Sequence, residues 1–411
     1  MIPSRRQVRL LLPLGAAVAL SLTGDSTLYA VLANQKDVLG ISLGAVGILL
    51  GVNRMIRILG NPLAGAWYDR LGRRWLFLLG LVLGIISTFS YSLVRGFWPL
   101  FGARLLWGIA WALINVGGYT MVLDWSTPTD RGRMTGFYQV SYMVGLSISP
   151  IVGGALTDAL GFRSAVRICA ILSSIGLAVA FVALPETRPS TRGSAGEGQG
   201  ARWSLRGVVR ALRQADRQIL LAGYIYLVIL FVGNGVMMST IGLYLEQRWG
   251  TTMSLAGWTF GVASLAGGML ALRASLGILA GPAAGTLSDH LGDRWPVARA
   301  GLLLGMVGFL VLAFVTQLWA VPIGVSLVSL TVGALTAVLS ALVGDVAVGN
   351  RQGSTIGALA AAGDLGSATG PLLAFAVAGT VDLRWVYLFC AVALVTGLLA
   401  IVGMGVDTRC H

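Results

Sequence analysis

Apolar runs of about twenty residues recur from one end of the chain to the other, each bounded by charged or turn-forming residues. A helix of about 20 apolar residues crosses the roughly 30 Å hydrocarbon core of a bilayer. Of the 411 residues, 56% are hydrophobic and 11% are charged, whereas soluble domains carry about 25% charged residues. The sequence therefore predicts an all-α, multi-pass membrane protein.

Hydropathy and turn signals predict twelve membrane-spanning helices. The first follows MIPSRRQVR, continues past the length of a signal-peptide core and lacks a cleavage site, so we interpret it as a span. The predicted spans are 10–32, 43–67, 75–94, 99–122, 135–157, 163–184, 218–244, 255–286, 296–316, 319–343, 354–378 and 384–406.

The formal charge of +13 orients the chain and does not indicate a nucleic-acid partner. Most of the 29 Lys and Arg residues fall in one set of loops, which includes both termini, the loop at Arg70 to Arg74 and the long central loop. The positive-inside rule makes that side cytoplasmic. We therefore expect both termini in the cytoplasm and the protein in the bacterial inner membrane.

Residues for metal, redox and nucleotide chemistry are scarce. The 3 cysteines have neither metal-like nor disulfide spacing, and the 2 histidines lie in a loop and at the last residue. Lys36, the only lysine, is not part of a P-loop. We expect no metal, no cofactor and no enzymatic activity, so that any energy coupling uses ion or solute gradients.

The segment between the sixth and seventh spans has a different composition. RPSTRGSAGEGQGAR predicts a flexible linker. Helically spaced arginines follow it and predict a basic helix on the anionic membrane surface, or else only fix the topology; they are Arg202, Arg206, Arg210, Arg213 and Arg217. The expected parts are a six-helix bundle over 1–189, a cytoplasmic linker with a basic amphipathic helix over 190–217 and a second bundle over 218–411.

The two halves of the chain repeat. NPLAGAWYDRLGRRW, beginning at Asn61, matches GPAAGTLSDHLGDRW, which begins 220 residues later at Gly281. Pro150 and Pro371 correspond at nearly the same shift. Such a register predicts two similar six-helix bundles, and two parallel repeats around a central cavity form a transporter architecture.

Four motifs resemble those of the major facilitator superfamily. GAWYDRLGRR (65–74) resembles its loop 2–3 signature, RLLWG (104–108) its segment 4 motif associated with proton coupling, and LPETR (184–188) a common segment 6 ending. GLSISPIVGG (145–154) resembles the segment 5 signature of exporters, with Ser149 replacing a glycine. The resemblance covers essentially the whole chain. It implies twelve transmembrane helices in two pseudo-symmetric six-helix bundles around a central cavity, as in the drug:proton antiporter branch.

The resemblance also implies a gate at loop 2–3. Asp69 and the arginines after it can pair across the cytoplasmic interface of the bundles, and breaking these pairs would let the bundles rock. The alternative is that the loop only sets topology. The candidate gating residues are Gly65, Asp69, Arg70, Gly72, Arg73 and Arg74, with Asp289 and Arg294 in the second copy.

The segment 5 motif predicts a kinkable, closely packed helix face. Small residues let helices approach each other in a membrane, and neighbouring groups cover the carbonyls that a proline frees. Tight packing against the eighth span competes with a direct part in transport. The candidate packing residues are Gly145, Ser149, Pro150, Gly153 and Gly154.

Six charged residues fall within the predicted spans, where charges are costly and mark functional sites. They are Asp25, Arg54, Arg57, Arg104, Arg273 and Asp364. On a helix, Asn53, Arg54, Arg57 and Asn61 share one stripe, and Tyr29 shares another with Asp25. We expect both stripes to face the central cavity.

Asp25 is the candidate proton carrier. Burial favours its neutral form and a neighbouring arginine favours the carboxylate, so it can gain or lose a proton as the cavity changes sides. Arg104 is the expected partner, and both belong to the proton-coupling set with Asp364, which could pair with one of the other arginines. The alternative is that static ion pairs hold the bundles together.

The six charges comprise four cations and two anions, so a counter-charge is expected. It could be chloride, water-filled access or an anionic group on the cargo. The candidate substrate-binding residues are Asn53, Arg54, Arg57, Asn61, Arg273, Tyr29, Tyr119, Tyr138, Tyr142 and Asn234, with ordinary helix packing as the alternative.

We predict a monomeric secondary active transporter that exports a small organic or amphipathic solute in exchange for protons by alternating access. One alternative is a symporter or exchanger for an organic anion or a phosphate-bearing, lipid-like solute. Another is a receptor or scaffold that does not transport. The expected partners are the small-molecule substrate, anionic in one version, together with protons and membrane lipids.

Overall fold

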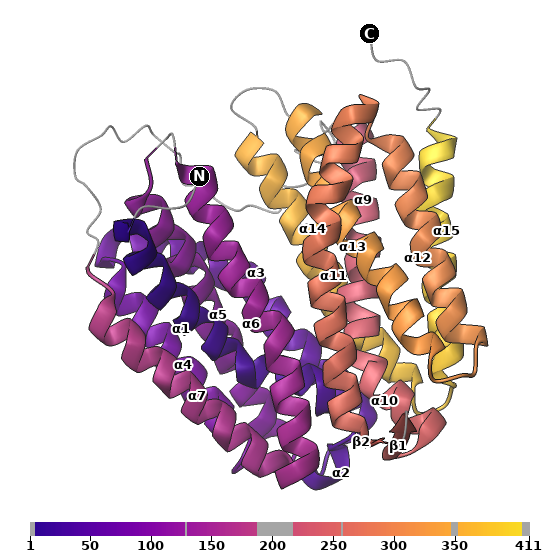
Figure 1. Cartoon of the computed structure of the whole chain (residues 1–411), viewed down its shortest axis with the longest axis horizontal. Coiled ribbons are helices and arrows are strands. Elements are labelled where there is room, and N and C mark those ends of the chain that lie inside the picture. The colour runs from indigo at the N-terminus through magenta and orange to yellow at the C-terminus, as the bar shows by residue number, and fades with distance from the viewer. Residues whose placement is uncertain (1–4, 128–129, 187–216, 256–257, 347–351, 405–411) are drawn as a thin grey trace.

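The computed structural model describes residues 5–127, 130–186, 217–255, 258–346 and 352–404 (Figure 1). The first bundle contains α1 (Arg5–Val31), α2 (Lys36–Leu39), α3 (Leu43–Leu71), α4 (Arg74–Ser90), α5 (Phe97–Trp125), α6 (Arg131–Leu160) and α7 (Phe162–Ala183). The second contains α9 (Arg217–Leu230), η1 (Phe231–Met237), α10 (Met238–Trp249), α11 (Val262–Leu291), α12 (Trp295–Phe314), α13 (Ala320–Val346), α14 (Gln352–Val377) and α15 (Leu383–Gly403), with strands β1 (Thr252–Leu255) and β2 (Trp258–Gly261).

Ten helical segments in the described residues are long and apolar enough to cross a membrane. One of them is the continuous segment α9–η1–α10, and the shorter apolar helix α4 and the Gly/Ala-rich α14 complete twelve spans. The predicted all-α fold with two six-helix bundles is therefore confirmed.

The bundles are built and joined in matching ways. In the first, α1 packs on α6 and α7 while α5 packs on α3 and α4; in the second, α13 packs on α11 and α12 while α14 packs on α9 and η1. The interface between them is formed mainly by α3 with α14 and by α6 with α11. The sequence repeat relates α3 to α11 and α6 to α14, so the interface is pseudo-symmetric.

Close contacts between the bundles concentrate at one end. We call the end where α1 begins and α15 ends the terminal end, and the end that carries α2 and the β1–β2 hairpin the distal end (Figure 1). At the distal end, Asn34 donates to Glu246 Oε2 at 2.6 Å and Asp158 accepts from the Ser264 amide at 2.7 Å. A side chain at Gly242 would overlap the Ala30 carbonyl. The bundles are thus held together distally.

The eighth span differs from its prediction of 255–286. Its first residues instead form an antiparallel hairpin in which Thr252 pairs with Gly261, and α11 then runs from Val262 to Leu291. Threonine and the aromatic residues Trp258 and Phe260 suit a strand, and a short apolar run does not distinguish strand from helix.

The predicted flexible linker and the basic helix that follows it fall outside the described residues. Both lie in residues 187–216 except for Arg217, which begins α9. The boundaries at 189 and 218 stay predictions.

Candidate functional site

A buried ion pair lies in the first bundle between α1 and α5. Arg104 Nη1 is 2.5 Å from Asp25 Oδ1, and the two side chains are 1% and 14% exposed. Arg104 also donates from Nε to the Leu49 carbonyl at 2.8 Å, which fixes the guanidinium against α3. The structure therefore pairs Asp25 with the expected arginine, and the partial exposure leaves the carboxylate within reach of a proton.

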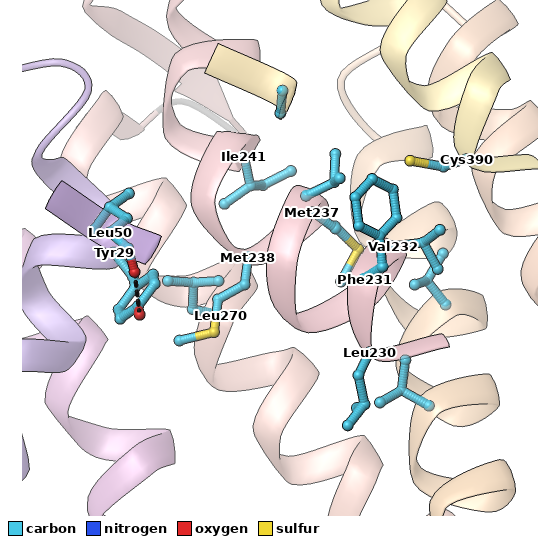
Figure 2. Close-up of a cluster of buried hydrophobic side chains, with 14 of the residues drawn as sticks. Tyr29, Leu50, Leu230, Phe231, Val232, Met237, Met238, Ile241, Leu270 and Cys390 are labelled. Atoms are coloured by element: carbon cyan, nitrogen blue, oxygen red, sulfur yellow. Dashed lines mark hydrogen bonds between the residues drawn. The ribbon is translucent and has the colours of Figure 1, made fainter. Parts of the chain in front are cut away.

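A hydrogen-bond chain extends from Asp25 to Arg54. Asn53 donates from Nδ2 to Asp25 Oδ1 at 3.3 Å. The Tyr29 hydroxyl donates to the Leu50 carbonyl at 3.1 Å or to Asn53 Oδ1 at 3.3 Å, and accepts from Arg54 Nε at 3.1 Å. The two predicted stripes thus face each other. Figure 2 shows the hydrogen bond between the Tyr29 hydroxyl and Leu50.

The Tyr29 ring lies between two cations. The guanidinium carbon of Arg54 is 5.3 Å from the ring centroid and that of Arg104 is 5.7 Å away. Cation–π attraction therefore adds to the hydrogen bond that holds Arg54.

An ion pair crosses the bundle interface near the middle of the spans. Arg57 Nη2 on α3 is 3.3 Å from Asp364 Oδ1 on α14, and the side chains are 21% and 22% exposed. Of the three arginines considered for Asp364, the structure selects Arg57. Two buried atoms of the same α3 stripe lack a hydrogen-bond partner in the described residues, Arg57 Nε and Asn61 Oδ1.

The remaining two arginines contact the seventh span from opposite bundles. Arg54 donates from Nη2 to Met238 Sδ at 3.6 Å, while Arg273 on α11 donates to Asn234 Oδ1. Asn234 lies in η1, a π-helical stretch that interrupts α9 and α10. π-Helical insertions occur frequently at functional sites. Hydropathy did not reveal this insertion; the glycines that flank Asn234 were its one visible signal.

The predicted aromatic residues lie within the first bundle. Tyr119 packs edge-on against Tyr138, with ring centroids 5.0 Å apart, and its hydroxyl accepts from Gln139 at 3.3 Å. Tyr142 packs against Trp111 at 5.7 Å. Tyr138 is only 1% exposed and packs in the core of the first bundle, and its part in substrate binding stays a prediction.

The loop 2–3 arginines form their pairs inside the first bundle and not across the interface. Arg73 Nε is 3.1 Å from Asp124 on α5, and Arg73 Nη1 donates to the Tyr68 carbonyl. Glu186 of the LPETR motif accepts from the backbone amides of Arg73 and Arg74 at 2.8 and 3.2 Å. Sequence reasoning assigned no partner role to Asp124 or Glu186.

The other members of the first gating set have simpler surroundings. Asp69 and Arg70 are exposed. Gly65 is half-buried with open space around it, and Gly72 ends α3 with a positive φ of 88°, a conformation that favours glycine. The Arg74 guanidinium lies over Phe181 at 5.3 Å.

The second copy repeats the arginine–aspartate pair. Arg294 Nε is 2.6 Å from Asp345 on α13, and its Nη1 is 3.0 Å from Asp289. These hydrogen bonds, led by the one to Asp345, raise the pKa of Arg294. Arg73 and Arg294 both precede the first residue of the following helix, so Arg294 is the counterpart of Arg73 and not of Arg74 as the sequence alignment indicated.

The segment 5 motif packs α6 on two partners at once. Gly145 and Gly153 lie against Ala19 and Thr27 on α1, and Gly154 lies against the Ala263 carbonyl on α11. The Pro150 carbonyl packs closely against Gly267 on α11, and the neighbouring Ser149 is buried. The motif therefore brings the first bundle into contact with α11.

Two bundles that pack through repeat-related helices, with paired and unpaired charges buried at their interface, define a transporter built from two parallel repeats. The sequence matches the family model of the Major Facilitator Superfamily over residues 14–277 and 268–408. The chain belongs to this superfamily: it is an integral, multi-pass membrane transporter and not an enzyme.

Named relatives agree with this membership. The class G tetracycline resistance protein of Vibrio anguillarum is 32% identical over 338 residues, which cover 80% of this chain and 79% of that protein. The class C tetracycline resistance protein of Escherichia coli is 27% identical over 369 residues, covering 85% and 87%. A crystal structure of a bacterial homolog of the human lysosomal transporter Spinster, in an inward-facing and unoccupied conformation, has a TM-score of 0.74 at 17% identity, covering 98% of this chain and 96% of that one.

Proposed function

We propose that the protein exports a small organic solute in exchange for protons by alternating access. The observation that carries this proposal is the buried ion pair of Asp25 and Arg104, in which the Asp25 side chain keeps 14% exposure. The relatives support the direction of transport, because they include tetracycline and multidrug resistance proteins.

The chemistry follows from the neighbours of Asp25. As a carboxylate, Asp25 holds both Arg104 and Asn53 through one oxygen, Oδ1. A proton on Asp25 removes the charge that holds them, so Arg104 becomes a buried cation without a counter-charge, which is unfavourable. Proton binding therefore favours a rearrangement of the polar interface, and the return of the carboxylate reverses it.

The arrangement of the bundles supports an inward-facing conformation. With the termini in the cytoplasm, the distal contacts close the outer side, and the charged interface is reached from the cytoplasm. In the outward-facing state Arg73 and Arg294 would lie closer to the opposite bundle, and the exposed residues Asp69 and Arg70 are available to pair across it. The proposed setting is the bacterial inner membrane, with the protein acting as a monomer among membrane lipids.

The solute in this proposal is amphipathic and carries a negative charge, because two arginines at the interface form no ion pair with a carboxylate among the residues that the structure describes. The same excess favours a second candidate function, a symporter or exchanger for an organic anion. The two functions differ in proton coupling and so can be separated by experiment.

The test is flux in vesicles that contain the purified full-length protein, with an imposed pH gradient and a panel of neutral, anionic and cationic aromatic solutes. We expect uptake into inside-out vesicles to follow the gradient and to fall at least ten-fold in Asp25→Asn. Asp37→Asn is the control, because Asp37 is exposed and its ion pair is with the neighbouring Lys36. Gradient-independent anion exchange would favour the second candidate. Unchanged gradient-driven transport in Asp25→Asn would overturn the proton assignment.

A further inference from the structure

The four arginines within the spans fall into two groups, those that form an ion pair with an aspartate and those that do not among the described residues. Asp25 neutralises Arg104 and Asp364 neutralises Arg57. In the described part of the chain, Arg54 and Arg273 form no ion pair, and their contacts are neutral groups. Asp364 and Asp25 act on Arg54 only from a distance, and neither arginine has a carboxylate in contact among the described residues, so a ligand that brings negative charge into contact would be stabilised there.

These two arginines are brought together by the seventh span. Arg54 reaches Met238 from the first bundle, and Arg273 reaches Asn234 from the second. Asn234 and Met238 are four residues apart, so their side chains lie on neighbouring turns of one helix face. Arg54 is also close enough for its charge to act on Arg273. A guanidinium from each bundle therefore flanks the π-helical turn.

Both guanidiniums keep donors for a ligand. Arg273 uses one donor on Asn234, and its buried Nε has no hydrogen-bond partner among the described residues. The planar fork of an arginine matches the two oxygens of a carboxylate or phosphate, and such charge-assisted bonds are stronger than neutral ones. Met238 lies beside Leu270 at this place (Figure 2), and both are buried, so the surroundings of the guanidiniums are apolar.

We propose that Arg54 and Arg273 together bind an oxyanion group, a carboxylate or a phosphate, on an aromatic or amphipathic solute. The site rests on the proposed function for the identity of its ligand as a transported solute. Because each bundle contributes one arginine, the bound oxyanion bridges the two bundles across η1. Of the four arginines within the spans, this assigns solute recognition to Arg54 and Arg273, whereas Arg104 and Arg57 pair with aspartates.

Equilibrium binding to the purified full-length protein in lipid nanodiscs tests the site without any need for flux. The probes are benzoate and phenyl phosphate, with benzamide as the neutral counterpart of benzoate and with chloride and inorganic phosphate as small anions. We expect benzoate and phenyl phosphate to bind and benzamide to bind at least ten-fold more weakly. Arg54→Gln and Arg273→Gln should each weaken benzoate binding by about ten-fold or more.

Two further sets of variants control for charge and folding. Arg95→Gln removes an exposed arginine outside the helices and should leave the affinity unchanged. Arg54→Lys and Arg273→Lys keep the charge but lose the planar fork, so we expect intermediate affinity for benzoate in protein that remains monodisperse.

Several results would overturn the proposal. These are equal binding of benzoate and benzamide, an unchanged preference for benzoate in both glutamine variants, no binding of either organic oxyanion, or an arginine-dependent response to the inorganic anions alone. A protein that binds benzoate through the two arginines but shows no proton-driven flux would overturn the proposed function and support the site. Proton-driven flux together with equal binding of benzoate and benzamide would support the proposed function and overturn the site.

Discussion

The Tyr29 hydroxyl on α1 accepts a hydrogen bond from Arg54 Nε on α3 at 3.1 Å, and it lies 3.3 Å from Asn53 Oδ1. Asn53 in turn donates to Asp25. Tyr29 therefore lies between the proposed oxyanion site and the proposed proton site, and three hydrogen bonds connect Asp25 to Arg54 through Asn53 and Tyr29.

Tyr29→Phe should weaken the coupling between proton and solute. The ring and its cation–π contacts remain, while the hydroxyl that links Arg54 to Asn53 is lost. We expect Asp25→Asn to change benzoate affinity several-fold in the wild-type background and markedly less in a Tyr29→Phe background. Tyr224→Phe is the matched control, because its hydroxyl bonds to Thr396 inside the second bundle. The same effect of Asp25→Asn in both backgrounds would contradict the link.

The Arg57–Asp364 pair should stabilise the present arrangement of the bundles. Both side chains are about one-fifth exposed, so a coupling energy of about 0.5–1 kcal/mol is expected from a double-mutant cycle of Arg57→Gln and Asp364→Asn. The measurement is the free energy of unfolding of the four proteins in detergent. A coupling energy of zero would mean that the ion pair adds nothing to the free energy of unfolding beyond the separate effects of the two side chains.

The two copies of the loop pair should differ in strength. Asp124→Ala leaves Arg73, which is 6% exposed, without its carboxylate, and we expect a cost of about 1–3 kcal/mol. Asp345→Ala acts on an Asp345 side chain that is 61% exposed, and Arg294 keeps Asp289, so the expected cost is below about 1 kcal/mol. Thermal unfolding of both variants checks the order. A larger loss of stability in Asp345→Ala would reverse our interpretation of the two pairs.

Much of this fold could be predicted because a membrane imposes simple rules on sequence. Apolar runs of spanning length gave the helices, and the repeated motif at Asn61 and Gly281 gave the two bundles. The hairpin at Thr252 escaped prediction because its residues are as apolar as a helix start. The register of the second loop also escaped it: Arg74 and Arg294 are identical in the sequence alignment, but Asp293 adds a residue before α12, which makes Arg73 the counterpart.

The polar site was predictable in its members but only partly in its pairs. Helical periodicity placed Asn53, Arg54 and Arg57 on one stripe, and the motif around Arg104 indicated its partnership with Asp25. Periodicity could not determine that Asp364 pairs with Arg57 and not with Arg54, because the pairing depends on how α3 and α14 pack against each other. Asn34 and Glu246 were missed since polar residues at the ends of spans look like ordinary loop residues.

The closed distal end gives a prediction with an unusually direct readout. The first amides of a helix have no partner within it, and the Ser264 amide of α11 is bonded instead to Asp158 of the other bundle. Its hydrogen exchange therefore reports the distance between the bundles. Asn34→Ala removes the side-chain bonds to Glu246 and to the Gly242 carbonyl, so the distal end should open more often.

We expect Asn34→Ala to speed exchange of a peptide containing Ser264 by several-fold, while the middle of α11 stays protected. Glu246→Gln retains an oxygen acceptor for Asn34, and its effect should be smaller because only the charge is lost. Ser126→Ala removes a hydroxyl at the terminal end that donates to the Leu123 carbonyl within its own segment, and it serves as the control. If exchange at Ser264 is the same in Asn34→Ala and Ser126→Ala, then Asn34 does not help to hold the distal end closed, and the contacts of α6 with α11 alone keep the bundles together there.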